Sequence, residues 1–300
     1  MLRIHGFYWA FPILATVFWS ATLLGLLLWW IIDDHHKTYQ IDEATVVFIS
    51  DVGAAHRGLF IPGCALTWIF YSATLFAERW LRHLRRIPGA LAVKDRWASI
   101  VAVFFGVIGG FALLLLSIFN AFEYSTAHWC LTAVFVVCVA ISAAAQTLEI
   151  MWLERDHRDR KHLRRNAIWK LVIVAVAIAF AIVFGATYGA CRHTQNADVA
   201  PQGRCNTVKS VSAACEWFIA FVFDVYLLTL ALDLWPAHKT KGHTFDHSLI
   251  EADRANILHY HKDGRPGAPR KPGMVHIAND ATPYAYGNTL RTQDEYRFDP

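Results

Sequence analysis

Between Trp97 and Phe119 the sequence reads WASIVAVFFGVIGGFALLLLSIF, without a single charged side chain. A helix needs about 20 predominantly apolar residues to cross the hydrocarbon core of a bilayer, because each residue adds about 1.5 Å along the helix axis. This segment meets that requirement. It therefore predicts a transmembrane helix.

Five other segments have similar length and apolar character. The predicted spans are residues 10–32, 59–77, 97–119, 129–153, 168–190 and 213–235. The composition agrees, since 55% of the 300 residues are hydrophobic and only 17% are charged, which is more apolar than soluble domains. The sequence predicts an all-α membrane protein with a bundle of six transmembrane helices, and it argues against a water-soluble enzyme.

Lys and Arg residues are distributed unevenly between the two ends of these helices. Cationic loops stay on the cytoplasmic side of a membrane. Arg3 and the loops at residues 78–96 and 154–170 carry 14 Lys and Arg residues, whereas the opposite ends carry 5. Six spans return the chain to the side where it started. Both termini are therefore predicted to be cytoplasmic.

The last 65 residues differ from the rest of the chain. Residues 1–235 form the predicted transmembrane domain, and residues 236–300 form a polar cytoplasmic tail with dispersed Pro and Gly and no apolar periodicity. Such a composition is typical of disorder. The tail histidines lack the tight spacing of a zinc site, and no cofactor or metal is predicted. A cytoplasmic protein partner is expected on the tail, and nucleic acid is not.

Two cysteines flank the outer loop between the fifth and sixth spans. Cys191 and Cys205 are 14 positions apart on the predicted non-cytoplasmic side, where disulfides form and persist. A loop of that size would be stabilised by about 3 kcal/mol. The alternative is two unrelated thiols.

Polar residues at the outer ends of the helices are candidates for a binding site. Ser50, Asp51 and Gly53 lie in the first outer loop, His128 stands at the mouth of the fourth span, and Glu216 lies near the outer end of the sixth. Such a cluster could bind a lipid headgroup, carry protons or hold a metal. The structural alternative makes Asp51 a loop cap, His128 an interfacial side chain and Glu216 a polar tie between helices.

Asp224, near the middle of the sixth span, is the deep acid of this chain. Charges at that depth are costly and are often functional. Asp224 alone suggests a proton-coupled or ion-coupled carrier, but the two halves of the sequence show no internal symmetry of the kind many carriers have. No hydrolase motif or phosphate-binding loop is present, so we predict no catalytic residue and no enzyme.

Basic residues beside the inner ends of the helices attract anionic inner-leaflet lipids, at about 1 kcal/mol for each charge. The predicted contacts with anionic lipids, including phosphoinositides, are Arg79, Arg82, Arg85, Arg86, Arg164 and Arg165. The simpler alternative is that these residues only set the topology.

Small residues four positions apart predict close helix packing, either within the bundle or in a homodimer. They are Gly106 and Gly110 in the third span, and Ala177, Ala181, Gly185 and Gly189 in the fifth.

The first outer loop carries a family resemblance. Residues 48–54 read FISDVGA. This heptapeptide resembles the signature of the membrane family that groups the damage-regulated autophagy modulators (DRAM), the fibroblast-growth-factor-receptor-activating (Frag) proteins and the fungal suppressor-of-four-kinase (Sfk) proteins. The N-terminal part of the calcofluor-white-hypersensitive (CWH) proteins of GPI-lipid remodelling is similar too. The resemblance covers residues ~8–235, with His128 opening the fourth span and Glu216 the sixth.

The resemblance implies a six-helix membrane protein without established catalytic residues. The layout is most similar to the suppressor-of-four-kinase branch, whose members help recruit a phosphatidylinositol 4-kinase to the plasma membrane and maintain phospholipid asymmetry. We therefore expect a non-enzymatic regulator of phosphoinositide signalling and phospholipid organisation in the plasma membrane. Two alternatives remain: a GPI-anchor lipid-remodelling factor of the Golgi or endoplasmic reticulum, and a DRAM-like autophagy modulator of the vacuole or lysosome.

Overall fold

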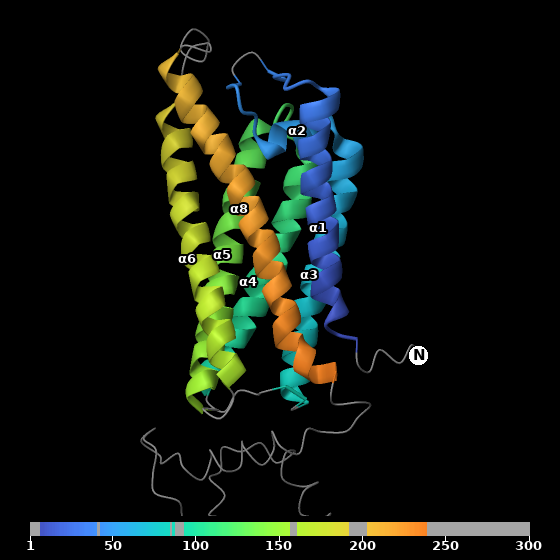
Figure 1. The fold of residues 1–300 in the computed structure, drawn as a ribbon, viewed down its shortest axis with the longest axis vertical. Coiled ribbons are helices and arrows are strands. Elements are labelled where there is room, and N and C mark those ends of the chain that lie inside the picture. The colour runs from blue at the N-terminus through green and yellow to red at the C-terminus, as the bar shows by residue number, and fades with distance from the viewer. Residues whose placement is uncertain are drawn as a thin grey trace, which may run out of the picture. The chain divides into compact units, whose positions relative to one another are not determined.

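Six long helices make up the body of the computed structural model, which describes residues 7–40, 43–84, 86–87, 93–156, 161–191 and 203–238 (Figure 1). They are α1 (Ala10–Leu28), α3 (Arg57–His83), α4 (Val93–Ile118), α5 (Ser125–Asp156), α6 (Lys161–Ala190) and α8 (Arg204–Leu234). The described residues include no strand. The prediction of an all-α fold with six membrane spans is confirmed, because each long helix is long and apolar enough to cross a bilayer.

Among the described residues, three shorter helical elements accompany the six long helices. A π-helical turn, Trp29–Asp33, continues α1, and a 3-10 turn, Trp235–His238, follows α8. The first outer loop contains a seven-residue helix, α2 (Ile49–Ala55), which spans the family signature. The sequence had predicted a loop for this segment.

Three helices extend well beyond the predicted spans, and one of them, α6, begins at Lys161 rather than at residue 168. α3 continues to His83 rather than ending at residue 77, and α8 begins at Arg204 rather than at residue 213. Hydropathy ends a span at its first charges. In α3 those charges are paired with residues of the same and neighbouring helices, so the helix continues past them.

The six long helices form a closed ring. α1 packs on α3, α3 on α4, α4 on α5, α5 on α6 and α6 on α8, and α8 closes the ring against α1 (Figure 1). The rings of Trp9 and Trp235, at the start of α1 and the end of α8, lie 5.3 Å apart between centroids. We name this the inner end, because the Lys and Arg distribution assigns it to the cytoplasm, and the end with α2 the outer end.

Glycines allow several helices to approach closely. A Cβ atom on Gly63 of α3 would lie 2.9 Å from both Cβ and Cγ2 of Thr22 in α1, and one on Gly110 of α4 would lie 2.8 Å from the Trp68 ring in α3. Gly106 meets side chains of α3 and α5 in the same way. The small residues of α4 therefore pack within the bundle. In α6, no described atom would lie within 4 Å of a Cβ on Gly185 or Gly189.

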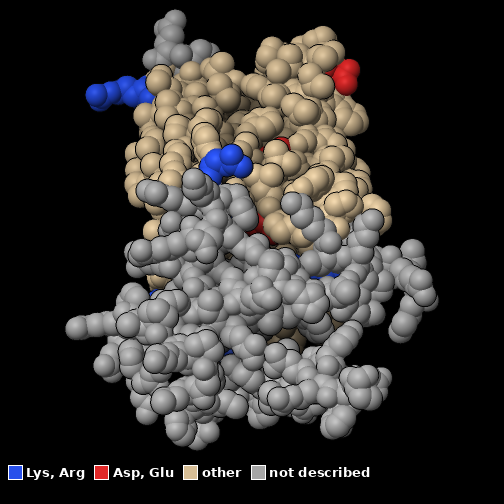
Figure 2. Space-filling model, turned by 60° about the horizontal axis from the view of Figure 1, so that its bottom comes forward, with Lys and Arg blue, Asp and Glu red and all other residues tan. Residues whose placement is uncertain are grey.

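Aromatic residues fill the centre of the ring, and large apolar side chains of both the aromatic and the aliphatic kind cover its outside. Phe223 of α8 makes edge-to-face contacts with Trp19, Tyr71 and Phe135 of three other helices. Large apolar side chains such as Phe104 and Ile182 are exposed on the outside, where lipid would cover them. Figure 2 shows one side of this surface, where few charged residues appear among the described ones. The chain is an integral membrane protein.

All described residues belong to one structural unit, residues 1–252. The predicted tail, residues 236–300, lies outside the described residues from position 239 onward.

Candidate functional site

A cavity of ≈140 Å³ lies at the outer end and is lined by the first outer loop, α2, α5, α6 and α8. We name it the outer cavity. Four of the residues singled out from the sequence, Ser50, Asp51, His128 and Glu216, line it together. One water molecule needs about 10–15 Å³ on this measure, so the cavity has room for a polar group the size of roughly ten water molecules.

α8 holds the first outer loop in place along one wall of the outer cavity. The backbone N–H of Thr45 donates to Oδ1 of Asn206 at 2.9 Å. Nε1 of Trp217 donates to the carbonyl oxygen of Val47 at 3.0 Å. These bonds join segments more than 160 positions apart in the sequence.

Glu216 caps the start of α2 from another helix. The backbone N–H of Ile49 donates to Oε2 of Glu216 at 2.8 Å, and the hydroxyl and backbone N–H of Ser50 also bond to this carboxylate. The first N–H groups of a helix have no hydrogen-bond partner inside the helix, and a carboxylate can accept their hydrogen bonds. Its negative charge is also stabilised by the positive end of the helix dipole. Glu216 is thus both a tie between helices and a wall of the cavity.

His128 is held at the base of the loop between α4 and α5. Its Nδ1 lies 2.9 Å from the carbonyl oxygens of both Leu116 and Phe119, at the end of α4. Carbonyl oxygens only accept hydrogen bonds, so Nδ1 carries a hydrogen and Nε2 is the acceptor when the ring is neutral. The buried ring is therefore oriented by the end of α4.

Charges of both signs line the outer cavity. Asp51 and Lys209 are buried, and Glu43 and Glu216 add two further carboxylates. Asp51, Lys209 and Glu43 each have an interaction partner within the protein. Carboxylates therefore outnumber ammonium groups in this lining.

Aromatic side chains of α5 and α6 form a further wall of the outer cavity, which we name the aromatic wall. The centroids of the Trp129 and Tyr188 rings lie 3.7 Å apart, and Phe184 stacks on Trp129 at 5.9 Å. Aromatic faces beside carboxylates favour a cation.

Gly53 of the signature serves packing rather than the cavity. A Cβ atom at this position would lie 2.5 Å from Cδ1 of Phe60, at the start of α3. Gly53 therefore lets α2 lie against α3, which positions Ser50 and Asp51 one turn earlier.

A second polar cluster lies at the outer end, and the sequence did not single out Asp34 or Tyr39 for it. Asp34 Oδ2 accepts a hydrogen bond from the Tyr39 hydroxyl at 2.6 Å and lies 2.7 Å from Nε2 of His56. The hydrogen bond from Tyr39, followed by that from His56, lowers the pKa of Asp34. Burial and Asp34 raise the pKa of Tyr39. The cluster fixes the loop that leads to Gln40 and Glu43 of the outer cavity.

Asp224 is tied to a neighbouring helix. The hydroxyl of Ser20 in α1 donates to Oδ2 of Asp224, and the side chain is half-buried between α1 and α8.

The structure places the inner arginines differently from one another. Arg82 is buried, with Nη2 2.6 Å from Oε1 of Glu78 and Nε 3.4 Å from Oε1 of Glu149. Arg86 is also buried and donates to the carbonyl oxygen of Ala237 at 3.2 Å. These two arginines bind the protein itself, which corrects the expectation that they face lipid headgroups.

The other four predicted lipid contacts divide into two groups. Arg79 is half-buried and Arg165 is exposed, so both can reach the inner surface of the membrane. Arg85 and the side chain of Arg164 lie outside the described residues.

An inner ionic cluster contains two ion-paired groups: Glu78 and Arg82 of α3 with Glu149 of α5, and Lys170 of α6 with Asp233 of α8. Lys170 is wholly buried and pairs with Asp233. The spacing of Glu78 and Arg82, four residues apart, was the available signal for an ion pair. The partners on other helices gave no local signal.

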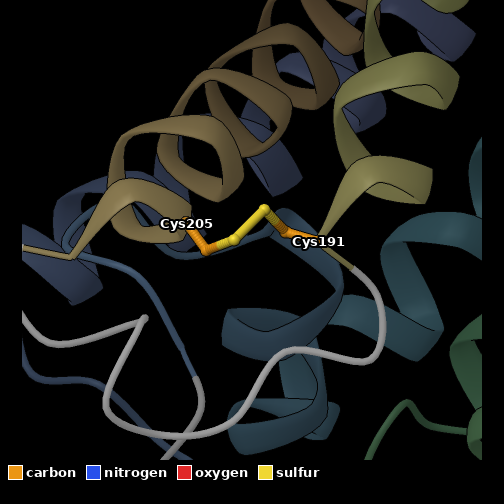
Figure 3. Close-up of a disulfide and its surroundings, with 2 residues drawn as sticks. All are labelled: Cys191 and Cys205. Atoms are coloured by element: carbon orange, nitrogen blue, oxygen red, sulfur yellow. A yellow bond between two sulfur atoms is a disulfide. The ribbon is translucent and has the colours of Figure 1, made fainter.

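The predicted disulfide is present. Cys191, just after α6, is bonded to Cys205 in the first turn of α8, with their Cα atoms 5.8 Å apart (Figure 3). The bond joins the outer ends of two helices that both line the outer cavity.

Comparisons with known proteins agree with this architecture. The family model described as the Frag1/DRAM/Sfk1/Cwh43P N-terminal domain matches residues 7–237. Protein sfk1 of Schizosaccharomyces pombe is 32% identical over 236 residues, which is 78% of this chain and 66% of the relative, just under two thirds of its length. Protein SFK1 of Saccharomyces cerevisiae is 23% identical over 86% of this chain and 89% of its own.

No solved structure matches this chain. The family match covers all six long helices and the signature at residues 48–54. The chain belongs to the Frag1/DRAM/Sfk1/Cwh43P N-terminal domain family.

Proposed function

We propose that this protein is a non-enzymatic regulator of phospholipid organisation and phosphoinositide signalling, which binds a lipid headgroup in its outer cavity. The observation that carries the proposal is the convergence of Ser50, Asp51, His128 and Glu216 on one cavity at the outer end. Family membership and the similarity to the two yeast proteins support a role of the suppressor-of-four-kinase type.

The proposed action links the two sides of the membrane. Lipid bound at the outer end would bias the bundle, and the inner end would assist recruitment of a phosphatidylinositol 4-kinase at the plasma membrane. Arg79 and Arg165 provide cationic contacts for anionic inner-leaflet lipid, and the tail provides a docking segment for a cytoplasmic protein. Three helices link the two ends, because α5, α6 and α8 each contribute to both the outer cavity and the inner ionic cluster.

The outer site is tested in cells from which the gene has been removed and replaced with Asp51→Asn. We expect loss of phospholipid asymmetry and reduced plasma-membrane phosphatidylinositol 4-phosphate at normal protein abundance. Glu123→Gln is the matched control, because Glu123 is an exposed acid of the outer end that does not line the cavity. Unchanged lipids in cells lacking the whole protein would refute the regulator, and a changed GPI-anchor lipid profile alone would favour a remodelling factor.

The inner contacts are tested separately with Arg79→Gln combined with Arg165→Gln. We expect weaker plasma-membrane recruitment of the kinase. Lys37→Gln removes an exposed cation from the outer end and serves as the control. Equal recruitment in both variants would remove the inner-leaflet step from the proposal.

A further inference from the structure

An apolar groove of ≈80 Å³ lies between α5, α6 and α8. We name it the apolar groove. Its lining is almost entirely aliphatic and aromatic, with Phe135 and Ala140 of α5, Ala177 and Ala181 of α6, and Ile219 and Phe223 of α8. The two small residues of α6 leave the space that larger side chains would fill.

The apolar groove begins one helical turn inward of the outer cavity on all three helices. Thr132 lines the cavity and Phe135 the groove, Phe184 lines the cavity and Ala181 the groove, and Glu216 lines the cavity and Ile219 the groove. Residues three apart on a helix are neighbours on the same face. The polar cavity and the apolar groove are therefore adjoining parts of one elongated site.

The position of α6 explains why a membrane molecule can reach this site. Only 22% of its apolar span is buried, the lowest share among the six described spans. Ile178, which lines the groove, is itself exposed, so the groove opens toward the hydrocarbon region, and the adjoining cavity lies at the outer end. A molecule with a polar head and an apolar chain matches this order.

The charges of the outer cavity select the kind of head. Lys209 favours a phosphate, whereas Asp51, Glu216 and Glu43 favour a cationic group. The adjacent, tilted rings of Trp129 and Tyr188 add aromatic faces that attract an ammonium. Since acids outnumber the lysine, an anionic head without a cationic group fits poorly.

We propose that the outer cavity and the apolar groove together bind one phospholipid with an ammonium-bearing headgroup, its head in the cavity and one acyl chain in the groove. This inference rests on the proposed function and names the lipid class that the outer site takes. The lipid charges join the existing interactions of Asp51 and Lys209 rather than replacing them.

The test uses the full-length protein in nanodiscs made from equal amounts of dioleoylphosphatidylethanolamine, dioleoylphosphatidylcholine and dioleoylphosphatidic acid. Native mass spectrometry counts the lipids retained after release from the disc. We expect one retained lipid, of the ethanolamine or choline class rather than phosphatidic acid. Equal retention of all three would overturn the headgroup assignment.

The groove is tested with Ala177→Leu combined with Ala181→Leu, which fills it. We expect retention to fall by about tenfold, or ~1.4 kcal/mol of binding free energy. The matched control is Ala179→Leu combined with Ala186→Leu, because these alanines of α6 are exposed and do not line the groove. Equal retention in the two double variants would overturn the assignment of the acyl chain.

A headgroup variant keeps the proposal falsifiable if the groove variant does not fold. Asp51→Asn should shift retention toward phosphatidic acid, whereas Glu123→Gln should not, and an unchanged lipid preference would count against the site. The cellular test remains separate. A lipid phenotype of Asp51→Asn with normal lipid retention by the groove variant would leave the proposed function standing and refute this inference. Loss of lipid retention by the groove variant, with no cellular phenotype of Asp51→Asn, would support this inference and refute the proposed function.

Discussion

Asp34 shows how one carboxylate can organise a loop at the membrane surface. Its Oδ2 accepts hydrogen bonds from Tyr39 and His56. Tyr39 lies six positions after the π-helical turn ends at Asp33, and His56 lies between α2 and α3. The ring of Trp29 stacks on His56 at 4.4 Å, so the end of α1 is held against the start of α3. The hydrogen bonds that Asp34 accepts favour the ionised form of this carboxylate.

The pH dependence of this contribution has a defined sign. The lowered pKa of Asp34 means that the folded state favours the ionised form, so the stabilisation is present above the unfolded pKa of about 3.9 and is lost as the pH falls through the folded pKa. The melting temperature of the purified wild-type protein should be higher than that of Asp34→Asn between pH 5 and 7, and this difference should close below about pH 4. Asp33→Asn, at an exposed neighbouring acid, should follow wild type throughout.

Gly63 sets the distance between α1 and α3. Because a Cβ there would lie 2.9 Å from Cβ of Thr22, Gly63→Ala forces the two helices apart. Overpacking of this kind costs about 1–3 kcal/mol, which should exceed the gain of about 1 kcal/mol from replacing glycine in a helix. The melting temperature should fall for Gly63→Ala but not for Gly58→Ala, which would meet no described atom within 4 Å. Equal melting of the two variants would show that α1 can move freely.

At the scale of elements, the disulfide ties α6 to the rest of the ring at its outer end. α6 has the least buried span, so the tie to α8 matters more here than between well-packed helices. Cys205→Ser should lower the free energy of unfolding by about 3 kcal/mol, the value for a loop of this size. Reductant should lower the melting temperature of wild type and leave that of Cys205→Ser unchanged. Cys130→Ser, at an exposed free thiol, is the control.

The long helices could be predicted from the sequence, but α2 could not. Hydropathy is a property of each segment by itself, so residues 97–119 indicate a span without knowledge of their neighbours. The signature helix depends on a cap from Glu216, which is 167 positions away from Ile49. No local pattern reports such a partner.

The site was partly predictable for the same reason. Ser50, Asp51, His128 and Glu216 stood out as polar residues at the outer ends of spans, and a bundle brings such ends together. Lys209 was not anticipated as a cavity residue, because the predicted sixth span began only at residue 213. Trp129 and Tyr188 lie within predicted spans, and hydropathy does not report which aromatic rings meet at a cavity. Arg82 was misplaced because its partner Glu149 belongs to another helix.

At the scale of the whole molecule, the inner ionic cluster links α3, α5, α6 and α8 near their inner ends. Lys170→Met alone should strand Asp233 as an unpaired buried charge and lower stability by about 3–5 kcal/mol. Asp233→Leu alone should cost a similar amount. The double variant should recover most of the loss, since replacing both charges with apolar residues is often close to neutral. The melting of the wild type, the two single variants and the double variant in detergent gives the coupling free energy between Lys170 and Asp233. Purely additive losses of stability would contradict this coupling.

The pairing of Lys170 with Asp233 also bears on the order in which the chain can be completed during synthesis. The two residues are 63 positions apart, so α6 enters the membrane before its counter-charge has been translated. Until α8 arrives, an ammonium group in α6 lacks its partner, and its insertion is costly. A chain that ends before Asp233 would therefore leave the ammonium group of Lys170 without this counter-charge inside the membrane.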